Sequence, residues 1–185
     1  MTEIILKGRL SWNDLFTAVD YENDGKFKYR AQLIVPKDSP EAKKLQAAIK
    51  AAATEGYGAK SEQVLKSVQG NPQKFFLTDG DEQENDEFHG CWIVRATRGQ
   101  NKGKPGVFDR DPSISLDESD GRFYRGCHVN MKIDVYGFPK MKGIYANLIA
   151  VQFVKDGEPF RGSSAPPTAD GFDDLSEGAD DDDLS

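Results

Sequence analysis

The sequence has few of the residues and patterns on which most enzymes and secreted proteins depend. Its 185 residues include two cysteines and two histidines, and it contains no GxSxG, GxxxxGK[ST] or glycine-rich dinucleotide turn. The apolar run near the start, Ile4 to Leu6, is too short for the core of a signal peptide, and no stretch approaches the ~18 apolar residues of a membrane span. We therefore expect a soluble, cytoplasmic protein without membrane contact. Nothing in these patterns requires catalysis.

The cysteines and histidines lie close together in the sequence, which raises the question of a metal site. His89 is near Cys91, and Cys127 precedes His128, which suits a zinc ion with two sulfur and two nitrogen ligands. Neighbouring residues of a strand point to opposite faces, so Cys127 and His128 would need a bulge to share one ion. A cytosolic protein also keeps its thiols reduced. We predict two buried, unpaired thiols, no metal and no other cofactor.

An acidic segment, TDGDEQENDE, leaves one enzymatic alternative open. Its carboxylates are those of Asp79, Asp81, Glu82, Glu84, Asp86 and Glu87. Their order does not match the spacing of a calcium-binding loop. A solvated connection is the simpler interpretation, and a magnesium-dependent nuclease that uses these carboxylates is the alternative.

The charge of the chain is divided between two unlike parts. The whole chain is at −7, with 24 basic and 31 acidic residues, but residues 169–185 hold eight of the acids and no Lys or Arg, so residues 1–168 are at +1. The tail acids are Asp170, Asp173, Asp174, Glu177, Asp180, Asp181, Asp182 and Asp183. The acidic balance is therefore a property of the tail and does not exclude nucleic acid as a partner of the body.

The pattern of apolar residues predicts an α+β protein that is mainly β. FKYRAQLIV and GCHVNMKIDVYGF alternate as half-buried strands do, and ILKGRL, CWIVRATR and GIYANLIAVQFV complete five strand candidates. Between the second and third strands, PEAKKLQAAIKAAA and SEQVLKSV predict helices, the first capped by Ser39. We predict a five-stranded Greek-key barrel of the oligonucleotide-binding (OB) type, because closure removes exposed edges. It forms one domain over residues 1–162, followed by a flexible linker and a disordered acidic tail over residues 163–185.

Basic and aromatic side chains recur together in three parts of the body. The first hairpin carries outward bases and a loop with aromatic residues, RATRGQNKGKPGVFDR forms a glycine-rich basic loop, and RFYRG and YGFPKMKGIY place bases beside rings. The candidate nucleic-acid-binding residues are Lys7, Arg9, Trp12, Phe16, Lys28, Arg30, Arg95, Arg98, Lys102, Lys104, Phe108, Arg110, Arg122, Phe123, Tyr124, Arg125, Tyr136, Lys140 and Lys142. Any one ring or base also suits a core or a solvated face. Their recurrence in a body of nearly zero net charge indicates a stripe.

A stripe of this kind suits a single strand better than a duplex. Rings stack on any base, at ~1–3 kcal/mol per base, while Lys and Arg neutralise phosphates. No recognition helix, zinc finger or basic zipper indicates groove reading. A tethered polyanionic tail would compete with weakly bound nucleic acid and be displaced by a long strand. The alternatives are a solubilising tail and a DNA mimic or adaptor whose acidic tail is the functional surface.

Six segments, in order, resemble the bacteriophage single-stranded-DNA-binding proteins. They are GRLSWNDLF, AQLIVPKDSP, FFLTDGDE, KPGVFDRD, FYRGCHVNMKIDVYGF and KGIYANLIAVQFVKDGEPF, and they cover about residues 5 to 162. The resemblance implies an OB barrel, sequence-independent binding of single-stranded DNA in phage replication and recombination, and action in the cytoplasm of the infected bacterial host. It implies a binding hairpin from Lys7 to Arg30, a basic loop from Arg95 to Arg110, and a tail that contacts replication or recombination proteins. A homodimer is left open.

Overall fold

The computed structural model describes residues 2–160, and the predicted acidic tail lies outside them. The strands are β1 (Thr2–Val19), β2 (Lys28–Pro36), β3 (Leu77–Asp79), β4 (Cys91–Gly99), β5 (Gly106–Phe108), β6 (His128–Phe138) and β7 (Gly143–Lys155). The α-helices are α1 (Pro40–Tyr57) and α2 (Ser61–Val68). Single 3-10 turns lie at Gly58–Lys60, Gly80–Glu82, Asp86–Phe88, Gln100–Lys102, Glu118–Asp120 and Pro139–Met141.

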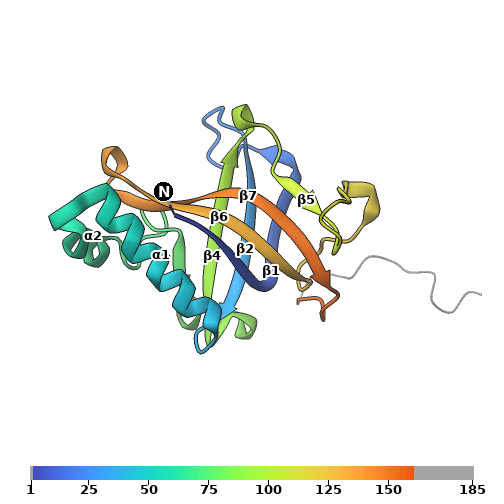
Figure 1. The fold of residues 1–185 in the computed structure, drawn as a ribbon, viewed down its shortest axis with the longest axis horizontal. Coiled ribbons are helices and arrows are strands. Elements are labelled where there is room, and N and C mark those ends of the chain that lie inside the picture. Colours follow the sequence, from blue (N-terminus) through green and yellow to red (C-terminus); the bar gives the residue numbers. More distant parts are fainter. Residues whose placement is uncertain (1, 161–185) are drawn as a thin grey trace, which may run out of the picture.

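The five long strands close into a barrel in the order β4-β2-β1-β6-β7 (Figure 1). Neighbours in this order are antiparallel, and the barrel closes where β4 and β7 run parallel, at Thr97 and Asn147. This arrangement confirms the predicted OB-type barrel. Two short strands were not predicted: β3 extends the sheet beside β4, and β5 runs parallel to β7.

The barrel interior is apolar and follows the predicted alternation. Cys127 and, along β6, Val129, Met131, Ile133 and Val135 are fully buried. The same inward phase buries the alternate side chains of β2 from Tyr29 to Val35. Both cysteines are unpaired; Cys127 is buried, as predicted, whereas Cys91 is only partly buried. Burial raises the pKa of the Cys127 thiol to about 11.

A β-bulge at Ser11 reverses the facing of β1 halfway along the strand. Leu10 pairs with Leu33 and Trp12 with Gln32, so Ser11 is an extra residue on β1. Before the bulge the even-numbered side chains of β1, such as Leu10, point inward, and after it the odd-numbered Leu15 does. Trp12 therefore points outward with Gln32.

Helix α1 covers the barrel on the side of β1 and β6, as Figure 1 shows. The Ser39 hydroxyl accepts a hydrogen bond from Ala42 N at 3.3 Å, which caps the helix where the sequence predicted. The end of the helix approaches β6 closely, since a Cβ on Gly56 would lie 3.0 Å from the Cα of Gly137. The predicted position of the helices, between the second and third barrel strands, is confirmed.

The first hairpin differs from its prediction. Trp12 and Phe16 were expected in a long loop, but β1 continues to Val19 and both lie on the strand. Phe27 was expected on the buried face of β2, but it precedes the strand and is exposed. Phe27 continues the alternation of the apolar residues that begins with Tyr29, so the sequence placed it inside the strand. Alternation does not show where a strand begins.

Within residues 2–160, neither helix is long and apolar enough to cross a membrane.

Candidate nucleic-acid interface

The outer surfaces of β1, β2 and β4 form one face on which predicted residues meet. The strand register aligns Trp12, Gln32 and Arg95 in one row across the three strands. It aligns Asp14, Arg30 and Thr97 in the next row. We call the surface formed by these two rows the outer face. It brings together three of the predicted residues: Trp12, Arg30 and Arg95.

Arg30 lies near the centre of the outer face with few partners. Its Nη2 donates a long hydrogen bond of 3.5 Å to Gln32 Oε1, and its guanidinium carbon lies 5.0 Å from the centroid of the Tyr21 ring. Its Nε is buried and has no hydrogen-bond acceptor among the described residues. Burial lowers the pKa of Arg30, and the charge of Asp14 opposes that shift.

Arg95, on the neighbouring strand, binds backbone carbonyls. Its Nη2 donates to Pro72 O and, at 3.4 Å, to Phe75 O. Burial lowers the pKa of Arg95, and the positive charge of Arg30 lowers it further. The outer face thus holds two partly desolvated guanidinium groups side by side, and neither forms an ion pair within residues 2–160.

Trp12 provides an accessible ring on the same face, with 41% of the residue exposed. Its Nε1 donates to Asp14 Oδ2 at 2.5 Å, which fixes the indole orientation. The guanidinium of Arg125 lies 6.0 Å from the ring centroid, and Arg125 Nε donates to Ser11 O at 2.9 Å. An indole held in this way can stack on a base with little further ordering.

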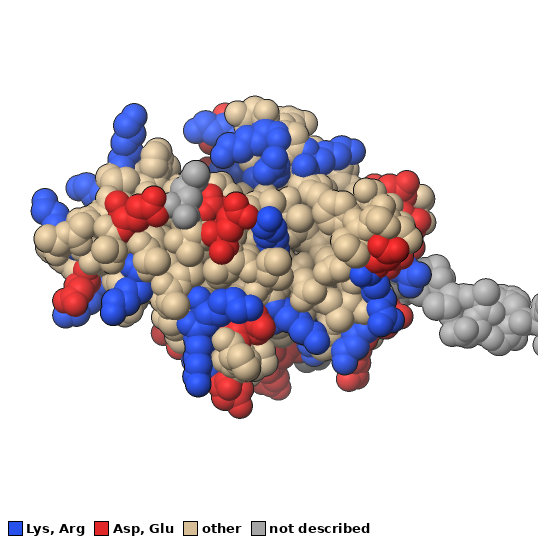
Figure 2. All heavy atoms as spheres, viewed as in Figure 1, with Lys and Arg blue, Asp and Glu red and all other residues tan. Residues whose placement is uncertain are grey.

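The β1–β2 loop and the basic turn after β4 meet at one end of the outer face. Gln100 N donates to Phe27 O at 2.9 Å and ties the β1–β2 loop to the turn after β4. Lys102 and Lys104 are exposed in that turn. In Figure 2, Lys and Arg gather at the top of the view, where Figure 1 places these two loops.

The basic loop begins later than predicted, because Arg95 and Arg98 lie on β4. Arg98 donates to Gly103 O at 2.9 Å, Lys102 O at 2.8 Å and Leu148 O at 3.4 Å. These bonds hold the turn after β4 and connect it to β7. The glycine-rich basic loop predicted from Arg95 to Arg110 therefore does not include these two arginines.

The β6–β7 hairpin supplies a second aromatic group. The ring centroids of Tyr136 lie 6.0 Å from Tyr145 and 6.4 Å from Phe138, and the predicted Lys140 and Lys142 are exposed at the tip. The Tyr145 hydroxyl donates to Gln73 O at 3.2 Å. Because Arg95 holds the neighbouring carbonyls of residues 72 and 75, the segment 72–75 connects the outer face to this hairpin.

Several predicted residues serve the fold instead. Tyr124, expected to stack on bases, is only 7% exposed and exchanges hydrogen bonds with Gly157 through its hydroxyl. Phe16 and Phe123 pack against each other and against the core. Arg9 donates to Gly126 O at 3.2 Å and Glu158 O at 2.5 Å. These four side chains stabilise the barrel in this structure. Because Tyr124 is buried, its ring has no exposed face on which a base could stack.

Other predicted residues lie elsewhere on the surface. Arg110 and Phe108 belong to the region of β5, which pairs with β7 near Gln152, and Arg122 lies 5.5 Å from the Phe153 ring. Lys7 is exposed on β1, where its backbone N–H donates to Glu41. Lys28 begins β2 opposite Gly99. A role of these residues in binding stays a prediction.

The list of candidates omitted Tyr21, Gln32, Phe27 and Tyr145. Tyr21 and Phe27 flank the β1–β2 loop, Gln32 lies between Trp12 and Arg95, and Tyr145 faces Tyr136. Tyr145 and Gln32 lie within segments that the sequence analysis had recognised. Only the pairing of strands shows that they adjoin the predicted residues.

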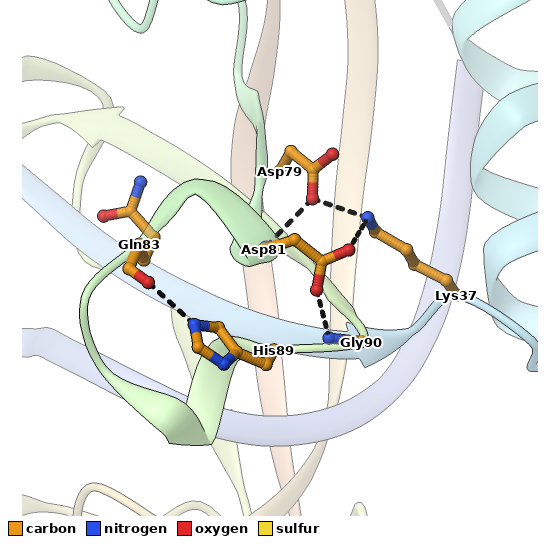
Figure 3. A network of polar contacts seen from close by, with 6 residues as sticks. All are labelled: Lys37, Asp79, Asp81, Gln83, His89 and Gly90. Atoms are coloured by element: carbon orange, nitrogen blue, oxygen red, sulfur yellow. Dashed lines mark hydrogen bonds and ion pairs between the residues drawn. The ribbon is translucent and has the colours of Figure 1, made fainter.

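The acidic segment forms a closed polar network around Lys37 (Figure 3). Lys37 Nζ lies 2.5 Å from Asp79 Oδ1 and 2.6 Å from Asp81 Oδ2, and Gly90 N donates to Asp81 at 2.6 Å. Hydrogen bonds to Asp79 and Asp81 raise the pKa of Lys37, and the bond from Lys37 lowers the pKa of Asp81. Residues 2–160 contain no group of three His, Cys, Asp or Glu side chains placed to hold an ion. Two of the carboxylates that the nuclease alternative would use, those of Asp79 and Asp81, are thus bound by Lys37.

A hollow lies beside the outer face. A cavity of about 1310 Å³ opens between α1, α2 and β3, with Ile49, Leu65 and Trp92 in its walls. Pro72 and Phe75, whose carbonyls Arg95 holds, form another part of its lining. The cavity therefore adjoins the interface without containing its predicted residues.

Comparisons with known proteins identify relatives of this chain. The model of the family described as Enterobacter phage Enc34, ssDNA-binding protein, matches residues 1–185. Protein p50 of Acyrthosiphon pisum secondary endosymbiont phage 1 is 38% identical over 171 residues, which cover 91% of this chain and 90% of that protein.

Two solved structures share the fold. The single-stranded DNA-binding protein from bacteriophage Enc34, in complex with ssDNA, is 25% identical with a TM-score of 0.68, covering 85% of this chain and 89% of that chain. The single-stranded DNA-binding protein gp2.5 of bacteriophage T7 is 14% identical with a TM-score of 0.54, covering 90% and 99%. The whole-length family match and the 38% identical relative lead to one conclusion: this chain belongs to the family of the Enterobacter phage Enc34 single-stranded-DNA-binding protein.

Proposed function

We propose that this protein binds single-stranded DNA without sequence preference through the outer face. The observation that carries the proposal is the row of Trp12, Gln32 and Arg95, with Arg30 beside it, on adjacent strands of an OB-type barrel. The relative from bacteriophage Enc34, solved in complex with ssDNA, supports it. A ring stacks on any base and a guanidinium binds any phosphate, so this chemistry does not depend on sequence.

The proposed path of the strand follows the connected surface described above. It begins at the basic turn after β4, crosses the outer face, passes the segment 72–75 and reaches Tyr136 and Tyr145 on the β6–β7 hairpin. Bases that stack on these rings must be unpaired, so a duplex would have to open before it could bind. We infer that the protein is not an enzyme and protects or presents single strands during phage DNA replication and recombination, in the cytoplasm of the infected host.

The acidic residues 169–185 would regulate the same surface. A tethered polyanion is present near the basic face at an effective concentration of order millimolar, so it competes with short or weakly bound strands. A long strand displaces the tail, which is then free to contact replication or recombination proteins.

The function is tested by fluorescence anisotropy with matched single-stranded and duplex oligonucleotides at several salt concentrations. We expect preference for the single strand and a slope of log affinity against log salt of roughly −3 to −4, since each neutralised phosphate contributes about −0.7. Equal affinity for the duplex, or a slope near zero, would contradict the proposal. An absence of any affinity for bare strands would favour the DNA-mimic alternative.

The tail is tested by deleting residues 169–185. Because this removes eight negative charges, affinity should rise, most at low salt. Adding the tail as a separate peptide should weaken binding again at millimolar concentration if it competes directly. Unchanged affinity of the truncated chain at low salt would leave the tail without an inhibitory role.

A further inference from the structure

We propose that Arg30 and Arg95 form a pocket for one phosphodiester group of the bound strand, and that Tyr21 covers this pocket before the strand binds. This inference rests on the proposed function and assigns a particular contact within it. It distinguishes these two arginines from the exposed lysines, which would follow the backbone only as point charges.

The first argument is the unmade hydrogen bond of Arg30. Its Nε is buried without an acceptor among the described residues, one of only two such side-chain atoms there. Asp14, opposite Arg30 in the register, accepts from Trp12 Nε1 instead. A buried donor without an acceptor destabilises the free protein, so a ligand oxygen at this position would relieve that cost.

The second argument is the charge of the pair. Arg30 and Arg95 lie on adjacent strands, where Arg95 pairs with Gln32, two residues along the strand from Arg30. Burial lowers the pKa of each arginine. The positive charge of Arg30 further disfavours the charged form of Arg95. Two desolvated cations without a carboxylate between them attract an anion, and planar guanidinium groups match the oxygens of a phosphate. The other charged group that faces Arg30 is Asp14.

The third argument is the position of Tyr21. Its ring lies over the Arg30 guanidinium at 5.0 Å. The loop that carries Tyr21 bonds mainly to itself: Asp20 accepts from Asp24 N at 3.2 Å and from Gly25 N at 2.9 Å. The bond from Gln100 N fixes only the end of the loop at Phe27, so residues 20–25 can move without breaking that bond. When a phosphate takes the place of the ring, Tyr21 is free to stack on the adjoining base.

Arg30→Lys is the sharpest test, because it retains the charge but removes the planar fork and Nε. We expect it to weaken binding of a phosphodiester oligonucleotide about tenfold, as bidentate charge-assisted bonds are lost. Arg9→Lys is the matched control, since the Arg9 guanidinium lies outside the outer face and is bound to Gly126 O and Glu158 O, and its effect should stay below about twofold. An oligonucleotide with a neutral methylphosphonate backbone should bind equally to the full-length wild-type and Arg30→Lys chains.

Two results would overturn the pocket. Equal affinity of Arg30→Lys and wild type for the phosphodiester strand would show that a point charge suffices. An equal loss on the methylphosphonate strand would show that Arg30 contacts a base. If the protein bound no single strand at all, the proposed function itself would be wrong. The two results above would refute only the pocket and would leave that function standing.

A measurement on the unmodified chain covers the case in which Arg30→Lys fails to fold. Inorganic phosphate is added to the wild-type protein while the arginine Nε–H resonances are followed by NMR. We expect the Arg30 resonance to shift and the Arg9 resonance, whose guanidinium is bound to backbone carbonyls, to stay in place. A stationary Arg30 signal would contradict the pocket. Tyr21→Ala should strengthen phosphate binding, and unchanged phosphate affinity would refute the covering role of Tyr21.

Discussion

A cation lies beside an aromatic ring at each end of β2, but the two cations differ in how completely they are hydrogen-bonded. Arg30, within the strand, lies 5.0 Å from the Tyr21 ring, and Lys37, just after it, lies 4.7 Å from the Trp92 ring. Lys37 also binds two carboxylates, which are fixed in turn by backbone N–H groups. Arg30 has one long hydrogen bond to Gln32 and a buried Nε without an acceptor.

This difference shows that partners, more than residue type, decide whether a cation serves the fold or a ligand. In the sequence, Arg30 and Lys37 look alike, because each is a basic residue in or next to a segment in which apolar and polar residues alternate. A cation whose bonds are complete can only lose by binding something else, whereas one with an unmade bond gains an acceptor. Substitutions at bound and at incompletely bound side chains test this distinction.

The largest effect should come from the buried ring. Tyr124→Ala removes a core side chain and its hydroxyl bonds to Gly157, so it should lower the free energy of unfolding by about 3–5 kcal/mol. Trp12→Ala should cost about 1–3 kcal/mol of binding with little change in stability. Urea denaturation and anisotropy on both variants measure the two quantities. A stable Tyr124→Ala chain that had lost its DNA affinity would reverse the assignment.

The exposed lysines of the turn after β4 should change the salt dependence of binding. Lys102→Ala with Lys104→Ala removes two phosphate contacts, so the salt slope should become shallower by about 1.4. Lys60→Ala with Lys66→Ala is the matched control, because it removes the same charge at the helices. The same change of slope in both double variants would mean that only net charge matters.

Lys37 should affect stability but not binding. Lys37→Met leaves Asp79 and Asp81 without their cation, and the loss for a surface ion-pair group is at most about 1 kcal/mol. This corresponds to a fall in Tm of about 2–4 °C for a chain of this size. Affinity for single strands should stay within about twofold. A clear loss of affinity would place Lys37 in the interface and break the comparison with Arg30.

The smallest effect should appear at acidic pH, in the hydrogen exchange of the Gly90 amide. Lys37 and Gly90 lower the pKa of Asp81 below its ordinary value of 3.8. A carboxylate with a lowered folded-state pKa contributes stability above its unfolded pKa and loses it as the pH falls through the folded one. Gly90 N–H should therefore lose its protection from hydrogen exchange only below about pH 4, as the Asp81 acceptor is protonated. Loss of protection at higher pH would show that Asp81 does not hold this amide.

Much of the barrel could be predicted because apolar and polar residues alternate along most of its strands. The alternation from Val129 to Val135 determines which face of β6 is buried, and the cap at Ser39 determines where α1 begins. β3 and β5, three residues each, are too short for periodicity to indicate. Their existence depends on pairing with β4 and β7, which is a property of the folded chain.

The site was harder to predict for a similar reason. The sequence identified Trp12, Arg30 and Arg95, but it gave Tyr124 the same standing, since a basic and aromatic cluster looks alike whether its ring is exposed or buried. Tyr124 is buried because its hydroxyl meets Gly157, 33 residues further along the chain. Long-range contacts of this kind leave no local pattern.

Ser11 has a consequence for how such a surface can diversify. If Ser11 were paired as a regular residue of the strand instead of bulging, Trp12 would keep the even-numbered, inward phase of Leu10, and the aromatic side chain would be directed into the barrel. The bulge absorbs the extra residue, so the side chains that follow it keep the faces that pairing with β2 gives them. Strand β1 can therefore gain or lose one codon at this point without turning Trp12 and the residues after it to the other face of the sheet.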